Sequence, residues 1–206
     1  MTAASATRPT TSTTVVVATG ILFAAAQLAV YATTIGREAT DFAATTVYRA
    51  ACVLLLAGFV GLIFAAVALH ARMAGRAGAL GTAGLVGAVT GTVLMAGDWW
   101  YETFAVSFYA EVAPQVLDVK GAGWLAAGGL VSYVVFALGW ALVGIAALRA
   151  GTFSRWAGIA LIVGGIAGFG AVLPPYGFAL GAAVAWAGLA ARTVRTGRQV
   201  LDPAVS

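Results

Sequence analysis

Six long runs of apolar residues divide this chain, and they constrain its fold more than any other feature. Each run is close to the ~20 residues that an α-helix needs to cross a hydrocarbon core about 30 Å thick. Backbone groups surrounded by lipid must bond within their own segment, so such runs are expected to be helices. The expected spans are residues 14–33, 50–70, 77–97, 122–148, 156–173 and 174–191.

Composition leads to the same conclusion, because 62% of the 206 residues are hydrophobic and only 9% are charged. A water-soluble domain could not cover its surface with so few polar groups. The sequence therefore predicts an all-α, polytopic transmembrane bundle that forms one domain over residues 1–206. The first run is interpreted as a retained span, since ~20 residues exceed the apolar core of about 7–15 residues in a signal peptide.

Basic residues in the short connections predict the orientation of the bundle. With the N-terminus in the cytoplasm, the inner side holds Arg8, Arg72, Arg76, Arg149, Arg155, Arg192, Arg195 and Arg198. The outer side then holds only Arg37, Arg49 and Lys120, so both termini are predicted to be cytoplasmic. The same orientation gathers most of the acids outside, namely Glu38, Asp41, Asp98, Glu102, Glu111 and Asp118.

Small residues predict where helices pack closely. Glycines four residues apart occur in three places, at Gly87 and Gly91, Gly164 and Gly168, and Gly177 and Gly181. Pro174 and Pro175 interrupt the last apolar stretch and predict a tight reversal between the fifth and sixth spans.

The segment from Asp98 to Glu111 follows the third run and is unusually rich in acids and aromatics. If the helix continues, Asp98 and Glu102 lie four residues apart on one face, with Tyr101 beside them. Two close carboxylates repel when both are charged, so one is expected to keep its proton and to act as a general acid. These three residues are the candidate catalytic groups.

Aromatic side chains near these acids could form the wall of an apolar site and stabilise a cation. The candidate binding residues are Trp99, Trp100, Phe104, Phe108 and Tyr109, with Tyr31, Trp124, Tyr133 and Tyr176 from other spans. Arg49, Glu38 and Asp41 form a supporting charged cluster, in which Arg49 could pair with Asp98 or Glu102. The alternative is an ordinary interfacial belt of Trp and Tyr, with solvated carboxylates.

Several other chemistries lack the residues they require. One cysteine and one histidine cannot make a zinc or haem site, and no glycine loop ends in Lys-Ser or Lys-Thr. The basic residues are scattered and form no stripe for nucleic acid. No metal or other cofactor is predicted, and the expected partners are membrane lipids and an apolar small molecule.

Residues 135–142 and 149–165, together with Tyr48-Arg49, resemble a widespread family of small bacterial multi-pass membrane proteins of unknown function. The shared pattern is a span, a short turn and a Gly-x-x-Leu-x-x-Gly-Gly span, here Gly158 to Gly165. Ser154 stands where that family usually has proline. The resemblance implies a multi-pass protein of the bacterial inner membrane and names no reaction.

The acid and aromatic cluster is also similar to that of the small membrane-bound terpene cyclases. This looser resemblance implies an acid-initiated, metal-independent cyclisation of an isoprenoid-type substrate, a reaction of the isomerase or lyase type. The alternative is a non-catalytic membrane protein, either a small-solute carrier or a partner subunit. A closed apolar cavity beside Asp98 would favour the enzyme, and a continuous polar path between the two faces would favour the carrier.

Overall fold

The computed structural model describes residues 11–117, 123–169 and 177–200, and every regular element within these ranges is a helix. The long helices are α1 (Thr11–Thr34), α3 (Thr46–Met73), α4 (Gly78–Trp100), α6 (Gly123–Ala150), α7 (Arg155–Phe169) and α8 (Gly177–Val200). The short ones are α2 (Ala39–Phe42), the π-helix η1 (Tyr101–Val106), α5 (Ser107–Val112) and the 3₁₀ helix η2 (Pro114–Val116). The predicted all-α class is confirmed.

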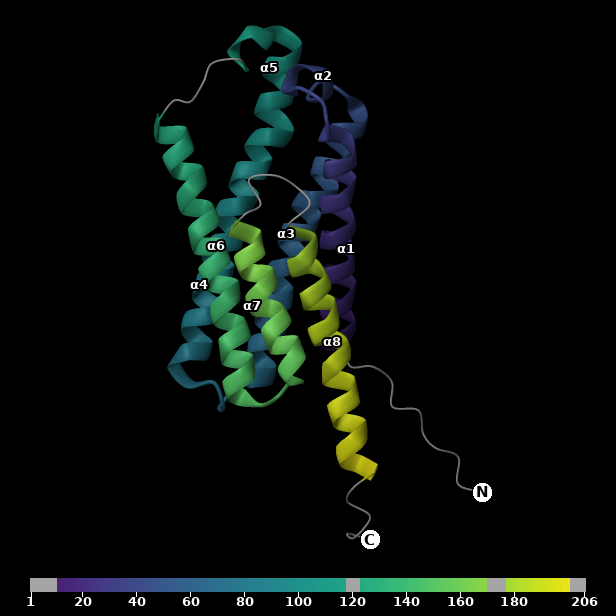
Figure 1. Ribbon diagram of the computed structural model, residues 1–206, viewed down its shortest axis with the longest axis vertical. Helices are drawn as coiled ribbons and strands as arrows, with labels where there is room; N and C mark the ends of the chain where they lie inside the picture. Colours follow the sequence, from purple (N-terminus) through teal and green to yellow (C-terminus); the bar gives the residue numbers. More distant parts are fainter. Residues whose placement is uncertain (1–10, 118–122, 170–176, 201–206) are drawn as a thin grey trace, which may run out of the picture.

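The long helices form a closed ring that follows the order of the chain (Figure 1). Each contacts the next, from α1 through α3, α4, α6 and α7 to α8, and α8 packs back against α1. Helix α1 begins and α8 ends at the same end of the bundle, which we call the lower end. Helices α2 and α5 lie at the opposite, upper end. Which membrane face each end meets stays a prediction.

Within the described residues, four helical segments are long and apolar enough to cross a membrane: Ser12–Thr34, Thr46–Met73, Gly78–Val112 and Gly123–Ala150. The apolar helices Arg155–Ala167 and Gly177–Ala190 are shorter. Helix α7 ends and α8 begins part-way up the bundle, so α1, α3, α4 and α6 rise beyond them (Figure 1). The bundle is therefore supported as a membrane protein, whereas six full spans are not confirmed. Pro174 and Pro175, the predicted reversal, lie outside the described residues.

The third span does not end at Gly97, as the apolar run suggested, because α4, η1 and α5 form one continuous helix of 35 residues, Gly78–Val112. At a rise of about 1.5 Å per residue this helix is roughly 52 Å long, well beyond a ~30 Å core. Pro114 then stops it, because proline lacks the N–H that a helix interior requires. The acid and aromatic segment therefore lies on a helix, and the long loop expected there is mostly helical.

Glycines allow the backbones of α4 and α6 to approach closely in the lower half of the bundle. A Cβ on Gly91 would overlap the backbone of Phe136, and a Cβ on Gly139 would overlap that of Gly87. The predicted packing role of Gly87 and Gly91 is therefore confirmed.

The other predicted glycine pairs also lie at helix contacts. Gly164 of α7 faces Leu180 of α8, and Gly181 of α8 faces Ala24 of α1, where an added Cβ would come within 2.8 and 2.7 Å of their backbones. Gly177 packs on the Gln27 side chain of α1. The surroundings of Gly168 lie outside what the structure describes.

Candidate functional site

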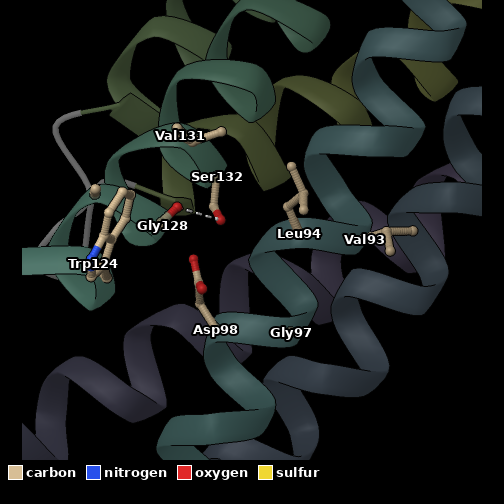
Figure 2. Close-up of a pocket in the computed structure, with 9 residues that line it drawn as sticks. Val93, Leu94, Gly97, Asp98, Trp124, Gly128, Val131 and Ser132 are labelled. Carbon is tan, nitrogen blue, oxygen red and sulfur yellow. Dashed lines mark hydrogen bonds between the residues drawn. The ribbon is translucent and has the colours of Figure 1, made fainter.

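Helices α4 and α6 diverge above their glycine contact and leave a groove of about 610 Å³ between them (Figure 2). The groove is lined by Val93, Leu94, Gly97, Asp98, Trp124, Ala127, Gly128, Val131 and Ser132. Its walls are almost entirely apolar, and Val93, Val131 and Trp124 are 53%, 55% and 91% exposed. The groove therefore opens sideways from the bundle, toward the lipid that would surround it.

The carboxyl group of Asp98 projects from α4 across the gap toward Ser132 of α6 (Figure 2). The Ser132 hydroxyl donates a hydrogen bond to the Gly128 carbonyl oxygen at 3.0 Å. Asp98 Oδ2 is buried and has no hydrogen-bond partner within 3.5 Å. A polar atom left unsatisfied in apolar surroundings is costly, and Ser132 is the polar side chain that interacts with this carboxyl group across the gap.

Glu102 lies on the same long helix four residues beyond Asp98 and is half-buried. Its carboxylate accepts a hydrogen bond from the Tyr48 hydroxyl of α3 at 3.4 Å. The buried Tyr48 ring packs against Phe42 with 4.8 Å between ring centroids. Tyr133 of α6 lies close enough to both carboxyl groups to interact with them electrostatically. Three helices thus bring two acids and two tyrosines together beside the groove.

The π-helix η1 begins directly above Asp98 and carries Tyr101 and Glu102. Within it, the Thr103 hydroxyl donates to the Trp99 carbonyl oxygen at 2.6 Å. A π-turn holds one more residue than an α-turn and is frequent at functional sites. Here it sets the direction of Glu102 relative to Asp98.

The aromatic residues of the segment do not form one wall. Trp99 is only 9% exposed and packs in the core, whereas Trp100, Phe104 and Phe108 are 58%, 49% and 57% exposed on the outward face of the helix. The rings of Trp100 and Phe104 lie 5.5 Å apart. This outward stripe is what an interfacial aromatic belt predicts.

The remaining aromatic candidates divide between the groove and other positions. Trp124 lines the groove, and Tyr133 lies beside the two acids. Tyr109 is half-buried, with its ring 5.9 Å from that of Phe108, and Tyr101 packs against the core. Tyr31 is half-buried in the upper part of α1. Tyr176 lies outside the described residues.

The supporting charged residues lie higher in the bundle than the acids. Arg49 forms an ion pair with Glu111 and also donates to the Ala44 carbonyl oxygen at 2.6 Å, so it does not pair with Asp98 or Glu102 as considered. Glu38 and Asp41 are exposed at α2, where Arg37 donates to the Asp41 backbone carbonyl at 2.9 Å. They contribute nothing to the groove.

Sequence reasoning missed Ser132 and the partner role of Tyr48. Ser132-Tyr133 is a polar pair inside an apolar run, and this could have marked the helix that faces Asp98. Cys52 was missed too, although it interacts with Tyr48 and Glu102 and with the Thr103 side chain. Among the described residues, no cluster of three or more His, Cys, Asp or Glu side chains could hold a metal ion.

No protein-family model, curated protein or solved structure matches this chain. The resemblances carried by residues 135–142 and 149–165 with Tyr48-Arg49, and by the acid cluster, therefore stay predictions.

Proposed function

We propose that this chain is an integral membrane enzyme of the bacterial inner membrane that cyclises an apolar isoprenoid-type substrate. Asp98 would act as the proton donor, and the groove between α4 and α6 would hold the substrate. The observation that carries this proposal is the carboxyl group of Asp98, which points into an apolar groove open to the side of the bundle.

The groove is open to the side and is not the closed cavity that would favour an enzyme, and this shape suits a substrate that arrives through the bilayer. A volume of about 610 Å³ falls within the range of about 300–1,000 Å³ found for small-molecule sites. Its lateral opening would admit an isoprenoid chain directly from lipid, without passage through water. The position of the acids at one end of the bundle is then no obstacle to a membrane-dissolved substrate.

The reaction would need no cofactor. The Asp98 O–H gives its proton to an alkene carbon, the alkene π pair forms the new C–H bond, and the adjacent carbon becomes a cation. A second alkene closes the ring with its own π pair. Loss of a proton from the final cation to the Asp98 carboxylate restores the acid and yields an isomer of the substrate.

Neighbouring groups would assist by holding charge and position. Glu102, hydrogen-bonded to Tyr48, lies on the next turn of the helix and adds negative potential beside the developing cation. Trp124 offers an aromatic face at the groove. Leu94 and Val131 supply apolar walls against which a prenyl chain can pack.

A carrier function has less support from the geometry. Below the groove, Gly91 meets Phe136, and buried Trp140 donates to Thr92 at 3.2 Å, so α4 and α6 are closed against each other there. The groove therefore does not continue between these two helices toward the lower end. A partner subunit that fills the groove is the competing possibility, and the following experiment addresses it.

The test compares membranes that contain the wild type, Asp98→Asn, Glu102→Gln or the control Glu38→Gln, whose side chain is exposed at α2. Each is incubated with farnesyl- and geranylgeranyl-substituted aromatic acceptors and their terminal epoxides, and isomers are separated by chromatography with mass detection. Removal of a general acid is expected to lower turnover about 100-fold or more, with little change for Glu38→Gln. Equal turnover in all four membranes rejects the acid role, and no turnover in any of them favours a partner subunit.

A further inference from the structure

The two acids beside the groove have no counter-charge among the residues that the structure describes. In the ranges that the structure describes, no basic side chain pairs with Asp98 or Glu102, since Arg49 is held by Glu111 and Ala44. None of the groove-lining residues is basic. An ionised carboxylate in these low-dielectric surroundings therefore has no basic partner among the described residues, and a cation in the groove would supply one.

The lining of the groove selects against an inorganic cation. Asp98 and Ser132 are its only side chains with oxygen atoms, and the Ser132 hydroxyl is already bonded to Gly128. Calcium takes about 6–8 oxygen ligands, and magnesium requires near-octahedral oxygen coordination. Five apolar or aromatic side chains instead line the groove with the carboxyl group, namely Val93, Leu94, Trp124, Ala127 and Val131.

We propose that the groove is a binding site for long-chain organic cations, in which a quaternary ammonium head pairs with the Asp98 carboxylate and the alkyl chain lies along Leu94 and Val131. This ligand class rests on the site of the proposed function. Proton transfer from Asp98 to an alkene creates a carboxylate that faces a carbocation. An ammonium head beside the Asp98 carboxylate forms the same pair of charges. Trp124 can add a cation–π contribution at the groove.

The test uses the full chain in nanodiscs of zwitterionic phosphatidylcholine and tritiated dodecyltrimethylammonium as the probe. The wild type is expected to bind it saturably, and unlabelled dodecanol of the same chain length is expected to compete poorly. Asp98→Asn should weaken binding about tenfold or more, because it removes a charge pair that is shielded from water.

Two glycine variants separate the groove from the rest of α6. Gly128 lines the groove and Gly129 does not, and an added Cβ meets nothing within 4 Å at either position. Gly128→Leu should fill the groove and abolish saturable binding, whereas Gly129→Leu should bind like the wild type. Equal binding by wild type and Asp98→Asn, or loss in Gly129→Leu alone, overturns the proposal.

The cyclisation assay distinguishes this inference from the proposed function. If the ammonium binds saturably and depends on Asp98, but no isoprenoid is turned over, the cation-site proposal is supported and the proposed enzymatic function is rejected. If turnover depends on Asp98 but the ammonium does not bind, the enzymatic function is supported and the cation-site proposal is rejected.

Discussion

The same two helices, α4 and α6, make the most tightly packed contact of the bundle in its lower half and an open groove in its upper half. The difference lies in how closely the two backbones approach each other. Below, Gly84, Gly87, Gly91 and Gly139 bring backbones into direct contact. Above, Gly97 and Gly128 line the groove, and a Cβ added at either position meets nothing within 4 Å. Small residues thus make a close membrane contact only where the two backbones meet.

The largest effect should come from adding one methyl group in the closed half. Gly139→Ala would drive a Cβ into the Gly87 backbone, and overpacking of this kind costs about 1–3 kcal/mol or more in the free energy of unfolding. The control Gly129→Ala meets open space and should stabilise the helix by about 0.5–1 kcal/mol. Unfolding by SDS from mild-detergent micelles measures both, and equal midpoints would mean that the lower contact is not closed.

A buried hydrogen bond tests the same closed half with a slightly smaller effect. Thr92→Val keeps the shape of the side chain but leaves the Trp140 indole N–H without its acceptor, at a cost of about 1–3 kcal/mol in the free energy of unfolding. Thr90→Val, on the exposed face of α4, is the matched control. If both variants unfold at the wild-type SDS concentration, water must reach the Trp140 indole, and α4 and α6 are not closed against each other there.

In the open half, Tyr48→Phe should cost about 0.5–1.5 kcal/mol of unfolding free energy, because it deletes the hydrogen bond to Glu102 and keeps the ring on Phe42. Tyr109→Phe serves as the control. A double-mutant cycle with Glu102→Gln isolates the pair, since residues in contact are non-additive. Strict additivity in the SDS unfolding assay would show that Tyr48 does not support the acid.

The smallest effect is expected at the upper margin of the open half. The Arg49 and Glu111 side chains are 41% and 47% exposed, so Glu111→Gln should cost at most about 1 kcal/mol. At about 1 M salt, where the screening length falls to about 3 Å, the difference from wild type should disappear. Glu38→Gln is the control, and a loss that persists at high salt would argue for a direct hydrogen bond instead of charge.

Apolar runs and glycine spacing were enough to predict the helical class, the positions of α1, α3 and α6, and the contact at Gly87 and Gly91. The span limit at Gly97 was wrong, and the predicted limits at residues 173 and 174 lie outside the described residues. Hydropathy marks where residues become polar, whereas a helix ends where its backbone bonding stops, here at Pro114. Fifteen residues of α7 also form a helix too short for a full crossing.

The spacing of Asp98 and Glu102 in the sequence predicted the pair of acids, but nothing in the sequence predicted the groove beside them. Its existence depends on how far α6 stands from Asp98, and no local pattern encodes a distance between helices. The partner of Arg49 was wrong for a related reason. The helix continues far enough to place Glu111 beside Arg49 of α3. A loop was expected after Gly97, and a loop does not predict this contact.

The π-helix at Tyr101–Val106 lies along the chain between Asp98, which lines the groove, and Glu111 near the upper end. Because a π-turn holds one residue more than an α-turn, deleting one residue there would restore regular α-helical winding and leave the segment beyond it near its present direction. Glu111 would then stay near Arg49, and Asp98 and the groove below would keep their places. The extra residue of the π-turn is therefore one that the long helix could lose without altering what lies on either side of it.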